Sequence, residues 1–200
     1  MKYKVLRMAK RRAGESREEF VKRWRAEHPK SAVVTLSTGE IALGGVESPF
    51  DGMSATYFPT ERAAREAAAQ FSGDLVMACD EHAMGQKKEP KSKIKIVRTV
   101  YRRRDLTHRQ FKDYWLNNHS KLEDRVIAES PVQKIIATFA LPEAGRDPAF
   151  DGMVELYFAA VEDIRATFAG PVPAMMRKDE ENFVQMDAPA IRVVCEEVTA

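Results

Sequence analysis

Aromatic residues recur at every fourth position in two stretches of the chain. In each stretch a phenylalanine, a tryptophan and a histidine follow one another at this spacing. They are Phe20, Trp24 and His28 in the first stretch, and Phe111, Trp115 and His119 in the second. Residues four apart lie on one face of an α-helix. Each stretch therefore predicts a helix with an aromatic stripe that ends in a histidine. Ser16 with Glu19, and Thr107 with Gln110, form the capping pattern that starts a helix at its first turn.

Short β-rich stretches surround these two helices. Strands are expected at residues 3–9, 31–43 and 53–58, and again at 94–101, 132–141, 153–158 and 191–198. Further helices are expected at residues 61–71 and 161–168. Each half thus has the order strand, helix, strand, strand, helix, strand. The polar, proline-containing segment 86–93 follows the first half, so its fourth strand is expected to be short or missing.

The two halves are copies of one unit. Residues 2–28 align with 93–119 without a gap and share eight identical pairs. Phe-Asp-Gly-Met at 50–53 returns at 150–153, and Asp-Glu at 80–81 returns at 179–180. We therefore expect two repeats, at residues 1–90 and 91–200. Because the strands are apolar on both faces, the two sheets are expected to pack against each other and leave a cavity between them.

Composition narrows the class of protein. The chain has 200 residues, 44% hydrophobic content and a net charge of +2, which favours a globular core and gives no reason to expect nucleic acid as a partner. Cys79 and Cys195 lie far apart in apolar runs and are expected to be buried thiols in a reducing compartment. No apolar run reaches membrane-spanning length and no signal peptide is recognisable. We expect a cytoplasmic protein without a membrane partner.

The order of these motifs resembles the EthD family. The helix motif Phe-x-x-x-Trp-x-x-x-His, the Phe-Asp-Gly turn and the Asp-Glu segment occur in this order in each repeat. The resemblance implies an α+β fold of the dimeric α+β barrel superfamily, with tandem ferredoxin-like βαββαβ repeats forming a pseudo-dimeric barrel on one chain. Residues 29–30 and 120–122 depart from the usual family pattern after the histidine, and Arg7 and Arg98 interrupt the usually apolar first strand.

Function does not follow from this fold alone. The resemblance implies a lyase without a cofactor that acts on an aromatic or polycyclic acid, with a decarboxylase of bacterial aromatic catabolism as the leading interpretation. A polyketide cyclase or dehydratase, and a non-catalytic binding or accessory protein, are the alternatives. A haem or oxygen-dependent oxidoreductase is a third possibility, because one histidine suffices as a haem ligand. A homodimer of pseudo-dimers is the expected assembly.

His28 and His119 are the candidate proton-transfer residues, since imidazole exchanges a proton near neutral pH. The alternative is that each histidine only binds free carbonyls at the end of a helix. Tyr101 is a further catalytic candidate, because Lys10 occupies its place in the first repeat. Metal is not expected, since the chain has no H-x-x-x-H, C-x-x-C or H-E-x-x-H pattern.

Arg7 and Arg98 are the candidate substrate-binding cations. A buried arginine needs an anionic partner. We expect an internal ion pair between Arg98 and Glu155, which would leave Arg7 as the freer guanidinium for a substrate carboxylate. Four aromatic residues are candidate walls of the substrate cavity, with ordinary core packing as the alternative: Trp24, Trp115, Tyr57 and Tyr157.

Overall fold

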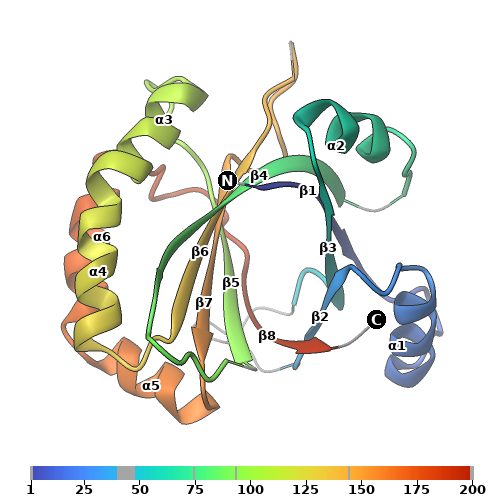
Figure 1. The fold of residues 1–200 in the computed structure, drawn as a ribbon, viewed down its shortest axis with the longest axis horizontal. Coiled ribbons are helices and arrows are strands. Elements are labelled where there is room, and N and C mark those ends of the chain that lie inside the picture. The colour runs from blue at the N-terminus through green and yellow to red at the C-terminus, as the bar shows by residue number, and fades with distance from the viewer. Residues whose placement is uncertain (1, 40–47, 74, 93, 144, 199–200) are drawn as a thin grey trace.

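Eight antiparallel strands close into one barrel, and helices cover its outside (Figure 1). The computed structural model describes residues 2–39, 48–73, 75–92, 94–143 and 145–198. The first half contains β1 (Lys2–Ala9), α1 (Arg17–Ala26), β2 (Val33–Ser37), β3 (Gly52–Phe58), α2 (Glu61–Ala68) and β4 (Leu75–Gln86). The second half contains β5 (Ile94–Val100), α3 (His108–Tyr114), a π-helical turn (Trp115–His119), α4 (Ser120–Glu129), β6 (Lys134–Ala140), β7 (Gly152–Phe158), α5 (Val161–Ala169), α6 (Val172–Glu180) and β8 (Arg192–Val198).

The strand order is that of two ferredoxin-like sheets joined at both edges. Around the barrel it is β1-β3-β2-β8-β5-β7-β6-β4, and β1 pairs with β4 to close the ring. The two halves meet where β2 pairs with β8 and where β4 pairs with β6. Figure 1 shows α1 and α2 on one side of the barrel and the helices of the second half on the other. The expected pseudo-dimeric α+β barrel is confirmed.

Several expected elements differ in extent. The fourth strand of the first half was predicted to be short or missing, and this is wrong, because β4 has 12 residues. Its Asp80-Glu81 segment extends the pairing with β1 and β6. The expected strand at 31–43 begins at Val33 and ends at Ser37, and residues 40–43 of that prediction lie outside the described residues. The second half also contains a helix, α6, that was not expected.

The repeated Phe-Asp-Gly motif and the aromatic stripe explain each other. A Cβ atom at Gly52 would lie 2.7 Å from Trp24 Nε1 and 2.8 Å from Phe20 Cζ. A Cβ atom at Gly152 would lie 3.1 Å from both Phe111 and Trp115. Only glycine lets the helix approach the strand this closely. The two motifs are therefore one packing device, present once in each half.

The barrel interior has an apolar and a polar part. The apolar part is a cluster that contains Leu6, Met53, Cys79, Val97, Met153 and Cys195. The polar part contains Lys4 and Lys95, each only 1% exposed, together with glutamates and tyrosines. Among the described residues, no helix is long and apolar enough to cross a membrane.

Candidate active site

In the first half, the predicted site residues pack against one another. Arg7 is buried between the rings of Trp24 and Phe71, at 5.0 and 4.5 Å from their centroids. Its Nη2 lies 3.5 Å from Glu27 Oε2, and its Nη1 donates toward His28 Nε2 at 3.4 Å. The other ring nitrogen of His28, Nδ1, donates to the Trp24 carbonyl at 2.5 Å. Arg7 was expected to be the freer guanidinium, and this is wrong, because Glu27 and His28 both contact it.

In the second half, the aromatic stripe passes through a π-helical turn. In the first half, α1 ends at Ala26, close to His28. In the second half, the helix continues past His119 as α4 to Glu129. The interpretation of His119 as a helix-terminal residue is therefore wrong. Within the turn the Ser120 N–H donates to the Trp115 carbonyl, five residues earlier. Such turns occur frequently at functional sites.

His119 is oriented by a carboxylate. Its Nδ1 lies 2.7 Å from Asp179 Oδ2 of α6, and the Tyr114 hydroxyl donates to Asp179 Oδ1 at 2.9 Å. His119 is 3% exposed. Burial lowers the pKa of His119 more than the bond to Asp179 raises it. A neutral imidazole that donates from Nδ1 to a carboxylate keeps Nε2 as a proton acceptor, so this pair can perform base chemistry.

Arg98 was expected to pair with Glu155, and this is wrong. It pairs with Glu180 of α6. Its guanidinium donates to both Glu180 carboxylate oxygens, and the Nη2–Oε2 distance is 2.9 Å. Glu155 is excluded because Arg98 lies opposite Val154, and neighbouring strand residues point to opposite faces of the sheet. Arg98 therefore faces the helices, while Glu155 faces the barrel interior.

A second arginine lies directly beside Arg98. Arg192 of β8 is its cross-strand neighbour, and like charges in this position repel. Burial lowers the pKa of Arg192, and Arg98 lowers it further. In the described part of the chain Arg192 has no carboxylate within ion-pairing distance. These two guanidinium groups form a local excess of positive charge.

A cavity of about 210 Å³ lies between the sheet and the helices of the second half. His119, Arg98, Arg192 and Trp115 line it together. Other walls are mostly apolar and include Ile96, Val126, Ile135, Val154, Leu156, Phe168 and Met176. An apolar cavity of about 150 Å³ holds benzene, so this one accommodates a single substituted ring. The sheet-to-sheet interface, where a cavity was expected, instead contains the two parts of the barrel interior described above.

Glu123 also lines this cavity. It is 1% exposed, and its Oε1 accepts the Trp115 indole N–H at 3.1 Å. Its Oε2 has no hydrogen-bond partner among the described residues. Burial raises the pKa of Glu123 to about 7. The cavity wall thus carries a carboxyl group that is protonated in part at neutral pH.

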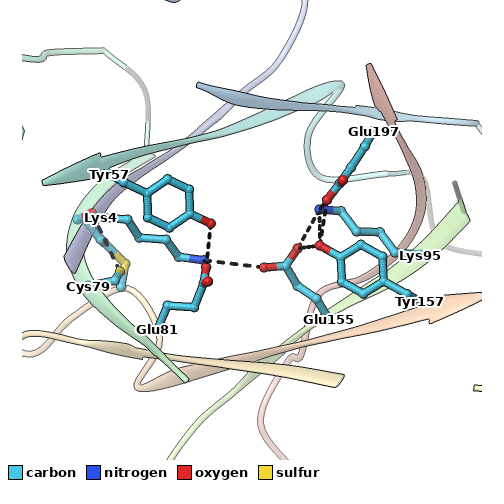
Figure 2. Close-up of polar contacts among 9 residues, drawn as sticks. Lys4, Tyr57, Cys79, Glu81, Lys95, Glu155, Tyr157 and Glu197 are labelled. Carbon is cyan, nitrogen blue, oxygen red and sulfur yellow. Dashed lines mark hydrogen bonds and ion pairs between the residues drawn. The ribbon is translucent and has the colours of Figure 1, made fainter. Parts of the chain in front are cut away.

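The three predicted tyrosines lie elsewhere. Figure 2 shows Tyr57 and Tyr157 inside the barrel, next to Lys4 and Lys95 respectively. The Tyr57 hydroxyl donates to Glu81 at 2.8 Å, and the Tyr157 hydroxyl donates to Glu197 at 2.6 Å. Tyr101 packs against the apolar cluster of the barrel interior. None of the three lines the cavity that holds His119.

Four residues of this site were not expected from the sequence: Glu123, Asp179, Glu180 and Arg192. Glu123 had a signal, because it continues the four-residue spacing of the aromatic stripe beyond His119. Asp179 and Glu180 belong to a recognised repeat, but their copies Asp80 and Glu81 lie on a strand, whereas they lie on a helix. Arg192 gave no signal in the sequence. No group of three or more possible metal ligands occurs among the described residues.

Comparisons with known proteins agree with the fold. Residues 103–187 match the model of the EthD domain. An anthrone oxidase-like protein aligns with 98% of this chain and 91% of its own, with a TM-score of 0.69 and 8% identity. A protein provisionally described as a monooxygenase, from Lactobacillus acidophilus NCFM, aligns with 98% of this chain and 92% of its own, with a TM-score of 0.50 and 11% identity.

A shorter structure aligns with about one repeat. It is an ethyl tert-butyl ether D (EthD) family protein from Bacillus halodurans C-125, which covers 53% of this chain and 99% of its own, with a TM-score of 0.42 and 16% identity. No curated protein matches the chain. Likenesses at these identities concern the fold alone.

Proposed function

Because residues 103–187 match the EthD domain and the chain folds as a pseudo-dimeric α+β barrel, we propose that the cavity of the second half is the active site of a lyase that forms or consumes a small aromatic acid. The observation that carries the proposal is the convergence of the His119–Asp179 pair and the arginine pair Arg98 and Arg192 on one cavity. The arginines would hold the carboxylate of the ligand. The histidine would move a proton at the ring.

Charge supports the anionic ligand. Three arginines line the cavity, namely Arg98, Arg177 and Arg192, against the carboxylate of Glu180 and the partly protonated carboxyl group of Glu123. Arg98 is already paired with Glu180, so Arg192 is the guanidinium best able to bind a ligand carboxylate. An anion beside Arg192 also relieves its repulsion with Arg98.

The reaction that fits best is elimination of water from a hydroxylated, partly reduced ring acid. His119 Nε2 would take a proton from carbon, and the C–H electron pair would form the new double bond. The C–O bond would break, and the leaving oxygen would take up the proton that His119 has accepted and depart as water. The carboxylate remains bound throughout, so the arginines stabilise both substrate and product.

Decarboxylation is the second candidate, favoured by the apolar walls at Val154 and Leu156, since removal from water destabilises a carboxylate. His119 would then protonate the ring carbon that loses CO₂. The arginines act against this reaction, because they stabilise the anion that must be lost.

The test uses the duplication as its control. We expect His119→Asn to lower turnover of a hydroxylated dihydrobenzoate by about 10² to 10⁴-fold, as for loss of a general base, while His28→Asn leaves it nearly unchanged. Conversion to the aromatic ring is followed by ultraviolet absorbance, and CO₂ release distinguishes the second candidate. Equal losses in the two variants, or full activity in His119→Asn, would contradict the proposal.

A further inference from the structure

Glu123 is a buried acid that forms no salt bridge with any described residue. It lies on α4 one turn after His119 and has no counterpart in the first half, where Ala32 takes its position at the offset of 91. Its single described hydrogen bond comes from Trp115. A fully ionised carboxylate in this place would be poorly compensated, because one oxygen has no donor among the described residues.

The protonated form removes this difficulty. A neutral carboxyl group keeps one oxygen as the acceptor for the Trp115 N–H and offers a hydroxyl hydrogen at the other. The wall that carries Glu123 is formed by α4, whereas the arginines come from β5, β8 and α6. The cavity therefore offers cations on one set of elements and a neutral hydrogen-bond donor on another.

From this arrangement we infer that Glu123 is a specificity residue whose carboxyl group donates a hydrogen bond to an uncharged oxygen of the ligand. The inference rests on the proposed function of the cavity and narrows it. The ligand class becomes a single-ring acid with its carboxylate at the arginines and a carbonyl or hydroxyl oxygen at a separate ring position. The protonated form of Glu123 repels a second carboxylate of a ligand less than the ionised form does. The ligand group that it binds best is a neutral oxygen acceptor.

The charged surroundings of Glu123 define the conditions of the test. His119 and Asp124 lie on its own helical segment, Glu180 and Arg177 come from α6, and Arg98 and Arg192 come from the sheet. The ionisation of Asp124 raises the pKa of Glu123 in addition to burial. His119→Asn therefore serves as a control for any titration near neutral pH.

The first experiment needs no ligand. Trp115 reports on Glu123 through their hydrogen bond, but the other tryptophan, Trp24, packs against the ring of His28 at 4.5 Å and would add its own signal. Tryptophan fluorescence is therefore titrated between pH 5.5 and 8.5 in Trp24→Phe, and in the same background with Glu123→Gln or His119→Asn. We expect a transition with a midpoint near 7 that is absent with Glu123→Gln and retained with His119→Asn. A transition that survives with Glu123→Gln, or no transition in Trp24→Phe alone, would overturn the inference.

The second experiment tests recognition with matched probes. Calorimetry compares 3- and 4-acetylbenzoate with 3- and 4-isopropylbenzoate, which have the same shape without the oxygen acceptor. We expect one acetyl compound to bind about three- to tenfold more tightly than its isostere, as for one net hydrogen bond. Glu123→Leu should abolish this preference, and Glu123→Gln, which keeps a donor, should retain part of it.

The outcomes separate the two proposals. Binding of the benzoates without a preference, or a preference that persists in Glu123→Leu, overturns the role of Glu123 and leaves the anion site intact. Absence of binding by every benzoate overturns the proposed function, and the ligand role of Glu123 with it. If Glu123→Leu does not fold, the preference for the acetyl compound is compared at pH 6 and pH 8 in the unmodified protein and in Glu123→Gln. The preference should fall at pH 8 in the unmodified protein only, and a preference that depends equally on pH in both, or in neither, overturns the role of Glu123.

Discussion

Replacing Lys95 by methionine removes one of two ammonium groups buried inside the barrel. Lys95 Nζ lies 2.5 Å from Glu155 Oε2 and 2.8 Å from Glu197 Oε1. Burial would lower the pKa of Lys95, but these carboxylates raise it overall. Methionine has a similar length and no charge, so the substitution isolates the electrostatic contribution. Among the described residues, Glu155 would keep the more distant ammonium group of Lys4, at 3.5 Å, and the Tyr157 hydroxyl, at 3.3 Å.

The magnitude follows from Glu155. Burial alone would raise the pKa of Glu155. Lys95 and Lys4 lower it by more than burial raises it, so the pKa falls from 4.5 to about 2. At about 1.4 kcal/mol per pKa unit, this shift corresponds to about 3 kcal/mol of stability at neutral pH. Removing one partner of a buried ion pair typically costs about 3–5 kcal/mol. We therefore expect Lys95→Met to lower the free energy of unfolding by about 3 kcal/mol.

The pH dependence has a definite sign. Because the folded-state pKa of Glu155 lies below its value of 4.5 in the unfolded chain, its stabilising contribution is complete above pH 4.5. It is lost as the pH falls toward 2. In Lys95→Met the folded-state pKa of Glu155 rises, so this part of the acid-induced loss should shrink.

Urea unfolding at fixed ionic strength, at pH 7 and across the acid range, measures both effects. Lys178→Met is the control, because its ammonium pairs with Glu181 at the exposed C-terminal end of α6, where an ion pair contributes little to stability. A Lys95→Met protein within about 1 kcal/mol of this control would refute the reasoning. An unchanged acid-induced loss would refute it as well.

Two other substitutions test the packing device and the anion site. Gly52→Ala should lower stability by about 1–3 kcal/mol, the range for overpacking. The loss should exceed that of Gly152→Ala, because the Cβ atom added at Gly52 would lie 2.7 Å from Trp24, whereas the Cβ atom added at Gly152 would lie 3.1 Å from Phe111 and Trp115. Equal melting temperatures for the two variants would contradict this expectation. Arg192→Gln should raise the melting temperature of the unliganded protein by removing the repulsion with Arg98 and should weaken benzoate binding. Unchanged benzoate affinity would contradict the assignment of Arg192.

The fold could be predicted because its signals are local and repeated. The aromatic stripe, the capping residues and the Phe-Asp-Gly segment each depend on neighbours close in sequence, and each occurs twice. The fourth strand of the first half was missed because β4 combines buried apolar residues with Asp80 and Glu81. Such charges are unusual in a strand interior, and here they are tolerated because Lys112 and Lys4 pair with them.

The candidate site could be predicted only in part. Arg98, Trp115 and His119 were expected as a set, and the structure brings them to one cavity, although their roles stay predictions. The partners of Arg98 and His119 come from α6, far along the chain. Sequence spacing carries no information about which distant helix covers a sheet. Glu155 was therefore expected as the partner of Arg98, although its side chain points to the opposite face of the sheet.

The correspondence between the two halves inside the barrel was also missed in the sequence. Lys4 lies opposite both Tyr57 and Cys79, and Lys95 lies opposite both Tyr157 and Cys195. The true structural counterpart of Cys79-Asp80-Glu81 is therefore residues 195–197. The matching Asp-Glu at 179–180 directed attention to the wrong segment. A search for Cys-x-Glu would have found the pair.

Glu155 at the centre of the barrel breaks this internal symmetry, because Ala55 occupies its place in the first half. Two identical one-repeat chains assembled as a dimer would have to place either two such glutamates or none in the middle. Two would bring four carboxylates to two ammonium groups, and none would leave the halves without their central shared acid. A single acid at a two-fold axis is available only to a chain in which the two halves are joined and can change independently. The same freedom allows Arg7 of the first half to pack between Trp24 and Phe71 while Arg98 and Arg192 line a cavity in the second half.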